Sequence, residues 1–137
     1  MKKIFVISIL SIFLVACGDK EKVDTGNDTV TLSHNFAEFN LDVDYSPTVK
    51  YEASLEKDVD GYEAQIEDEV NNENLRGNKA FDKLNPILEK LKFDSTTPNE
   101  EVIEEVLTAF GLENNFVEFD LDVLFSDGTQ KEYRLIK

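Results

Sequence analysis

Cysteine is almost absent from this chain of 137 residues, since Cys17 is the only one. A single cysteine excludes any disulfide within the chain. Histidine is equally scarce: His34 is the only one, and it lies where a polar segment meets the first predicted strand, with few neighbours to orient a catalytic imidazole. The Gly-x-Ser-x-Gly motif of serine hydrolases is also missing. These absences favour a protein that is not an enzyme and that needs no cofactor.

A hydrophobic run long enough to span a membrane is missing as well. Residues 4–15 are apolar apart from two serines, but about 12 residues are too few to cross a bilayer core of about 30 Å, which takes roughly 20 residues of helix. Lys2 and Lys3 precede this run and the small Ala16 follows it, which is the order found in a removable export signal. We therefore predict that residues 1–16 form a signal peptide.

Cys17 directly follows the predicted signal peptide. The tetrad Leu14-Val15-Ala16-Cys17 resembles the bacterial lipobox, in which the cysteine thiol takes a diacylglyceryl group before a peptidase cuts ahead of it. We therefore expect lipidation at Cys17, with the acyl chains holding the protein in the lipid bilayer of the cell membrane, on its extracytoplasmic face. The alternative is an ordinary secretory signal, which would leave Cys17 as a free thiol in an oxidising compartment.

The mature chain would be poor in basic residues. Cutting before Cys17 leaves 137 − 16 = 121 residues and removes two lysines, so the formal charge becomes 12 − 29 = −17. Such a charge repels nucleic acid and anionic lipid headgroups but allows cations and basic peptides as partners. Residues 17–31 are polar enough to form a flexible tether behind the lipid, and residues 32–137 fit one domain, which we expect to be monomeric. A simpler interpretation is that the charge keeps an exported domain soluble.

Alternation of apolar and polar side chains predicts about five strands. The first three cover residues 36–45, 49–56 and 62–67. The last two cover residues 116–125 and the segment around Tyr133, on either side of a hairpin turn that contains Gly128. Because apolar residues occupy only one side of these strands, we expect an antiparallel sheet that is covered on one face.

Two helices are predicted between the third and fourth strands. Asn78 is the expected N-cap of the first helix, whose apolar residues recur at helical spacing as far as Leu91, with a kink at Pro86. Thr97-Pro98-Asn99-Glu100 predicts a capping box with proline in the first helical position, and Gly111 predicts the end of this second helix. The fold class is therefore α+β: a single antiparallel sheet of about five strands with two helices packed on one face, in the order β-β-β-α-α-β-β.

Two of the predicted strands have similar sequences. Residues 35–45 and 115–125 are identical at seven of eleven positions. A duplicated hairpin would explain this likeness, and so would two strands that converged on one pattern.

The polar side of the predicted sheet is rich in carboxylates. Like charges on adjacent strands, about 4.8 Å apart, destabilise one another unless a positive group offsets them, so a cation or a basic peptide could bind there. The candidate residues for this face are Asp42, Asp44, Glu52, Asp120 and Asp122. The same side would also carry Glu56, Glu63, Glu67 and Glu132, with Lys50 and Arg134 as compensating charges. An ordinary solvated sheet face is the plainer interpretation.

Residues 42–53 begin like an EF-hand calcium loop but do not complete one. Pro47 stands where the loop needs glycine, and Ala53 stands where it needs a bidentate glutamate. The sequence therefore identifies no particular metal, and it names no protein partner.

Two functions remain open at this point. The first is a non-enzymatic binding or interaction module that is anchored to the membrane. The alternative is a cell-envelope hydrolase that uses a pair of carboxylates. A cleft that holds a desolvated carboxyl group of raised pKa would favour the hydrolase, whereas carboxylates spread over a flat, exposed face would favour the module.

Several segments together show a familiar combination of strand, cap and turn residues. They are the lipobox, the Phe-x-x-Phe-x-Leu-x-Val strand, Leu75-Arg76-Gly77, Thr97-Pro98-Asn99-Glu100 and the strand and turn of residues 119–129. This combination resembles the YusW-like family of small lipoproteins from Gram-positive bacilli. The resemblance covers nearly the whole domain and implies a Gram-positive cell surface, but it carries over no catalytic residues.

Overall fold

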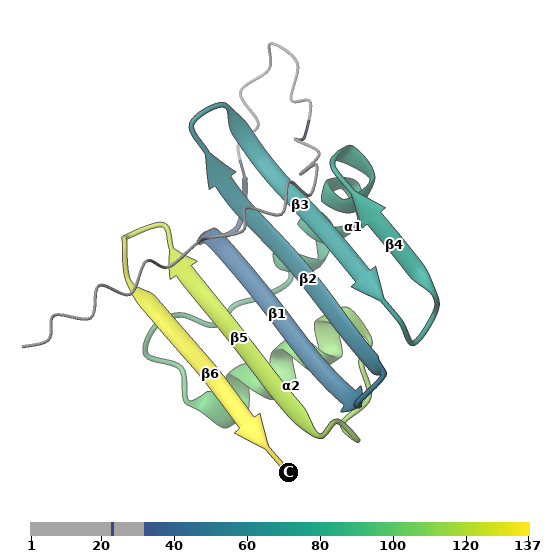
Figure 1. Cartoon of the computed structure of the whole chain (residues 1–137). Coiled ribbons are helices and arrows are strands. Elements are labelled where there is room, and N and C mark those ends of the chain that lie inside the picture. Colours follow the sequence, from purple (N-terminus) through teal and green to yellow (C-terminus); the bar gives the residue numbers. More distant parts are fainter. Residues whose placement is uncertain (1–22, 24–31) are drawn as a thin grey trace, which may run out of the picture.

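The chain forms a six-stranded antiparallel sheet with two helices on one side, in a computed structural model that describes Val23 and residues 32–137 (Figure 1). The strand order is β4-β3-β2-β1-β5-β6, and both helices lie behind the sheet in the view of Figure 1. This arrangement confirms the predicted α+β class. In chain order the elements are β1 (Phe36–Ser46), β2 (Val49–Asp58), β3 (Gly61–Asp68), β4 (Glu73–Arg76), α1 (Asn78–Leu88), α2 (Asn99–Phe110), β5 (Glu118–Phe125) and β6 (Gln130–Ile136).

β4 is the strand that the sequence did not predict, and it raises the count from about five to six. It has four residues, none of them fully buried, so no run of alternating apolar side chains marks it. The chain reverses at Asn72, which has a φ of 56°, and β4 then pairs with Gln65–Asp68 of β3. Asparagine tolerates this left-handed conformation better than most residues. β4 therefore depends on its neighbour rather than on its own pattern.

The hydrophobic core lies between the sheet and the two helices. Alternate residues of β1 point toward the helices, and Phe39 and Val43 have no exposed surface. Phe110, at the end of α2, stacks on Phe39 with the ring centroids 5.7 Å apart. β5 runs antiparallel beside β1, with Leu41 opposite Leu121. The two segments of similar sequence are therefore neighbours near the middle of the sheet.

The ends of the helices differ in part from the prediction. α1 begins after Gly77 and ends at Leu88, two residues beyond Pro86, so Leu91 is buried but lies outside the helix. The predicted capping box of α2 is wrong. Pro98 occupies the N-cap position without a side-chain hydrogen bond, and the Thr97 hydroxyl instead accepts a hydrogen bond from the Asp94 backbone N–H at 3.0 Å. Gly111 ends α2 in the left-handed conformation, as predicted.

The predicted export signal of residues 1–16 and the predicted lipidation site Cys17 lie outside the described residues. The predicted tether also lies outside them except for Val23, which is buried against the domain. Among the helices that the structure describes, none is long and apolar enough to cross a membrane.

Candidate functional site

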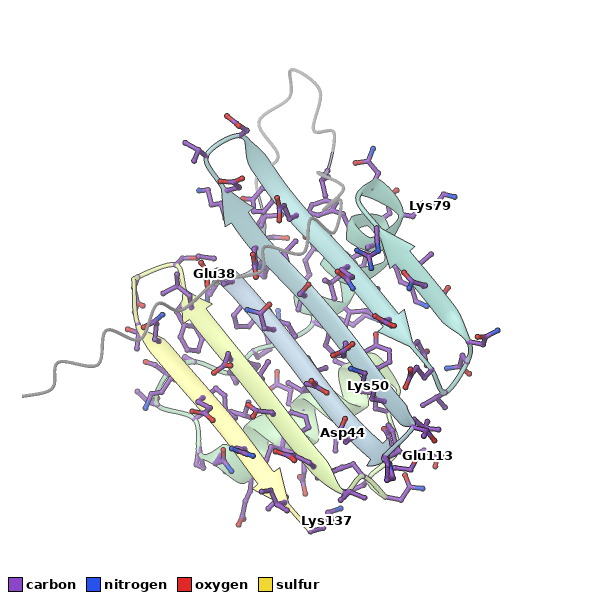
Figure 2. The ribbon with its side chains drawn as sticks, viewed as in Figure 1. Glu38, Asp44, Lys50, Lys79, Glu113 and Lys137 are labelled. Atoms are coloured by element: carbon purple, nitrogen blue, oxygen red, sulfur yellow. The ribbon has the colours of Figure 1, made fainter. Side chains whose placement is uncertain are left out.

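The open face of the sheet, on the side away from the helices, is strongly acidic. Figure 2 shows this face toward the reader, with Glu38 and Asp44 of β1 and Lys50 of β2 labelled. Side chains alternate between the two faces of a strand, so the register of the sheet decides which of them share this side. The carboxylates on it are Glu38, Asp42, Asp44, Glu52, Glu56, Glu63, Glu67, Glu118, Asp120, Asp122 and Glu132. We call this set the acidic face; it includes all five candidate residues predicted from the sequence.

Four of these carboxylates form a line across four neighbouring strands. In the register of the sheet, Glu67 of β3 stands opposite Glu52 of β2, and Glu52 stands opposite Asp42 of β1. Asp42 in turn stands opposite Asp120 of β5. We call these four residues the carboxylate row. Since adjacent strands lie about 4.8 Å apart, each member of the row faces a like charge at short range.

Basic side chains lie within ion-pair distance of two members of the carboxylate row, Glu52 and Asp120. The Lys50 ammonium lies 2.8 Å from a Glu52 oxygen. The Arg134 guanidinium contacts Glu118, and its Nε lies 3.7 Å from an Asp120 oxygen. Among the described residues, no lysine or arginine lies within ion-pair distance of Asp42. Asp42 therefore faces a carboxylate on each neighbouring strand without an ion pair of its own.

The pKa values of the two central aspartates reflect this crowding. Loss of hydration, followed by the charges of Glu52 and Asp44, raises the pKa of Asp42 from 3.8 to about 6, although this side chain is exposed. Partial burial, followed by the charges of Asp122 and Glu132, also raises the pKa of Asp120, with Arg134 acting in the opposite direction. In addition, the buried Oδ1 atom of Asp120 accepts no hydrogen bond from any described residue. Both carboxylates would gain from a positive partner.

A hollow of about 380 Å³ lies over Asp42, Glu52 and Asp120, three members of the carboxylate row. Its polar lining comes from Asn40, Asp42, Glu52, Ser54, Gln65, Asp120 and Asp122. Most sites for drug-like molecules are enclosed and predominantly apolar, whereas this hollow is open to solvent and largely polar. Its chemistry suits a small or extended ligand of positive charge rather than an apolar molecule.

At one side of the hollow, three carboxylates stand close enough to share one cation. Asp120, Asp122 and Glu132 each offer an oxygen, and these oxygens lie within 4.8 Å of one another. Calcium binds oxygen ligands at about 2.3–2.6 Å, so two ligands on opposite sides of one ion are separated by about 5 Å. Asp122 and Glu132 are exposed, whereas Asp120 is half-buried.

The structure assembles the five candidate residues unequally. Asp42, Glu52 and Asp120 lie in the carboxylate row, and Asp122 lies in the adjacent cross-strand position beside Asn40. Asp44 lies at the far end of β1, opposite Lys50 and Glu118. Sequence reasoning left Glu38 and Glu118 out of the face, although their even spacing from Asp42 and Asp120 was a usable signal. It had no signal for the pairing of Asp42 with both Glu52 and Asp120, because strand order was needed for that.

Comparison with known proteins assigns the chain to a family. The YusW-like protein family matches residues 37–127, which is more than half of the chain. The chain belongs to this family. It is 29% identical over 120 residues to the Uncharacterized protein YusW of Bacillus subtilis (strain 168), an alignment that covers 85% of this chain and 83% of the relative. No solved structure matches the chain. The resemblance predicted from the sequence is therefore confirmed, and the matched segment includes the whole carboxylate row.

The remaining candidate for chemistry, His34, lies in the core beside Phe36. Its Nδ1 accepts a hydrogen bond from the Phe36 backbone N–H at 3.3 Å, and its ring stacks on the Phe36 ring. Burial lowers the pKa of His34, with the charge of Glu89 acting in the opposite direction. The Nε2 atom of this buried ring has no hydrogen-bond partner among the described residues.

One nucleophile motif escaped the sequence analysis. Ser54 and Lys57 have the Ser-x-x-Lys spacing used by some acyl-transfer enzymes. That motif requires both side chains on one side of a helix. Here both residues lie in β2, where positions three apart point to opposite faces of the sheet. The spacing therefore does not bring the Ser54 hydroxyl to the Lys57 amine.

Proposed function

We propose that this protein is an extracytoplasmic lipoprotein, anchored to the cell membrane through Cys17, whose domain is a non-enzymatic module that binds positively charged ligands on its acidic face. The observation that carries the binding proposal is the carboxylate row, in which Asp42 faces a carboxylate on each side. A ligand that places positive charge over this row relieves repulsion that folding has built in. The simplest ligand is a divalent cation, and a basic peptide is the extended form of the same chemistry.

The location rests on the order of features in the first 17 residues. A basic start, a short apolar run and a small residue before the only cysteine support export followed by lipidation. Lipid chains contribute about 0.8 kcal/mol per buried CH₂, so two or more of them hold a protein firmly at a bilayer. The formal charge of −17 for residues 17–137 disfavours nucleic acid as a partner of the exported domain.

Fatty-acid labelling in the host cell tests the anchor. We expect the parent protein to incorporate a fatty-acid analogue, and the Cys17→Ser variant to incorporate none and to keep its signal peptide. The mass of the mature protein gives the cleavage site independently. Label retained on the Cys17→Ser protein would overturn the lipidation proposal.

Thermal melting tests the acidic face. The protein would be residues 18–137, which retain the buried Val23, and it would be melted with millimolar calcium or with sodium chloride of equal ionic strength. A ligand at about ten times its Kd stabilises the folded state by roughly 1.4 kcal/mol, which is several degrees for a domain of this size. Sodium screens charges without bridging them, so we expect it to do less. A short oligolysine peptide in place of calcium tests the extended form of the ligand.

Two variants make this test specific to the face. Changing both Asp42 and Asp122 to asparagine should remove most of the calcium-dependent shift. Glu101→Gln is the matched control, because Glu101 is an exposed carboxylate on α2, on the opposite side of the sheet. Equal shifts with calcium and sodium, or an unchanged response in the double variant, would mean that the face is simply solvated.

One observation favours a hydrolase as the second candidate function. The raised pKa of Asp42, about 6, is suitable for a general acid. Against this, the hollow over Asp42 is open to solvent, and the Asp42 side chain is itself exposed. Incubation of the protein with purified cell-wall glycan decides between the two: release of reducing ends by the parent but not by Asp42→Asn would favour the hydrolase.

A further inference from the structure

Val23 is a docking residue, although the segment around it has the composition of a flexible tether. Its side chain is buried, with 7% of its surface exposed, and belongs to the hydrophobic cluster of the domain. Its backbone N–H donates a hydrogen bond to the Tyr62 carbonyl oxygen, with an N···O distance of 2.9 Å. Its own carbonyl oxygen lies close to Gly61, 3.7 Å from where a Cβ would stand on that glycine. Both contacts are to the first residues of β3.

The position of Val23 is explained by the length of β4. Within the described part of the chain, β4 pairs only with Gln65–Asp68, the second half of β3. The edge of β3 continues past the end of β4: the Ala64 carbonyl accepts a hydrogen bond from the Gly77 N–H at 3.0 Å, and the next outward carbonyl is that of Tyr62. An unpaired strand edge is a template for another extended segment. The Val23 N–H pairs with the Tyr62 carbonyl oxygen on that edge.

We infer that Val23 clips the N-terminal segment to the edge of β3 and so holds the turn between β2 and β3 close to the membrane anchor. The first part of this inference rests on the contacts above, and the second part also rests on the proposed lipidation of Cys17. The occupant of the β3 edge is then a segment of the same chain. In the sequence, Cys17 lies 23 − 17 = 6 positions before Val23, and Leu32 lies 32 − 23 = 9 positions after it.

The clip changes how far the domain can stand from the bilayer. Cys17 and Val23 are 23 − 17 = 6 residues apart, a span of at most about 20 Å. Without the clip, the free stretch of chain would extend from Cys17 to Leu32, which is 32 − 17 = 15 residues and spans at most about 50 Å. At full extension this span of about 20 Å exceeds the Debye length of about 8 Å at physiological salt, so anionic headgroups would then repel Asp58 and Asp60 of the turn only weakly.

The clip also fixes which end of the sheet faces the membrane. The turn between β2 and β3 lies at the opposite end of β2 from the turn between β1 and β2 (Figure 1). β2 has ten residues and is therefore about 30 Å long. The turn between β2 and β3 therefore faces the bilayer. The acidic face is then on the side of the domain and does not lie against the lipid.

Amide hydrogen exchange tests the clip without any assumption about the anchor. In the protein purified from its host, whatever its N-terminal processing, we expect the Val23 amide to exchange at least about tenfold more slowly than an unstructured peptide of the same sequence. Val23→Asp should bring the amide of residue 23 to the unstructured rate. Val59→Asp is the matched control, because Val59 lies in the turn between β2 and β3, two residues before Gly61, and is 98% exposed. An unprotected Val23 amide in the parent protein would overturn the clip.

Energy transfer to a membrane dye tests the orientation. The lipidated protein, labelled at Val59→Cys or at Thr48→Cys, would be placed in phosphatidylcholine vesicles that carry an acceptor lipid. We expect strong transfer from position 59 and weak transfer from position 48, and at least about a twofold loss of the difference when Val23→Asp is added. Equal transfer from both positions would overturn the orientation. Failure of the protein to bind vesicles would reject the anchor and the orientation, while the exchange result would still decide the clip.

Discussion

β1 and β5 carry similar sequences, yet their carboxylates lie in different electrostatic surroundings. The two strands lie side by side, and each sends its large apolar residues into the same core. On the other face, Asp120 of β5 has the Arg134 guanidinium 3.7 Å away on β6. Asp42 of β1 has Glu52 in the corresponding direction on β2. The repeated sequence specifies the strand, and the neighbouring strand decides the charge balance.

Removing a core phenylalanine from β1 or β5 gives the largest expected loss of stability. Phe39 and Phe119 occupy equivalent positions 80 residues apart, and neither has exposed surface. Replacing a buried phenylalanine by alanine removes apolar burial and leaves a cavity, so each of Phe39→Ala and Phe119→Ala should destabilise the fold by about 3–5 kcal/mol. Urea denaturation measures both variants. A loss at one position more than about 2 kcal/mol larger than at the other would break the equivalence of the two strands.

This equivalence shows what the sequence could predict. Alternation of apolar residues located five strands, because each of them buries one side against the helices. The left-handed glycines Gly111 and Gly128 were also predictable, since few other residues fit those positions. β4 was not, because four residues paired with β3 carry too little pattern of their own. Neither was Val23, one of two valines in an otherwise polar segment.

Substitutions in the turns that follow β1 and β5 should change the stability of the fold by a smaller amount. Gly128 has a φ of 89°, a conformation that side chains rarely adopt, and no atom lies within 4 Å of where its Cβ would stand. Gly128→Val should therefore destabilise the fold by about 1–2 kcal/mol through backbone strain alone. Thr48 occupies the equivalent position after β1 and is exposed, without a positive φ. Thr48→Val should change stability by less than about 0.5 kcal/mol, and equal chemical-denaturation midpoints for Gly128→Val and the parent would contradict this account.

The candidate site was predictable in membership but not in arrangement. A period of two was enough to place Asp42, Asp44, Glu52, Asp120 and Asp122 on one face. The carboxylate row depends on β1 lying between β2 and β5 in a particular register, and no local pattern encodes that order. The strength of repulsion at Asp42 therefore becomes visible only in three dimensions.

The smallest effect, and the one most specific to the comparison, concerns charge removal at Asp42 and Asp120. The pKa of Asp42 is raised from 3.8 to about 6, so between these two pH values the folded state binds more protons than the unfolded state. The contribution of Asp42 to the stability of the parent therefore falls as pH rises through this window. Above about pH 6 Asp42→Asn, which carries no charge to repel, should be more stable than the parent.

A shift of about two pKa units corresponds to at most roughly 3 kcal/mol, and solvent screening at this exposed side chain reduces the expected gain to about 1 kcal/mol. The gain should be full at pH 7 and should disappear near pH 4, where the parent carboxyl group is protonated. Asp120→Asn should gain less, because it also loses the attraction of Arg134. Urea denaturation of the three proteins from pH 4 to pH 8 measures these differences. A gain for Asp42→Asn that is equal at pH 4 and pH 7, or smaller than that of Asp120→Asn, would show that charge repulsion in the carboxylate row is not its cause.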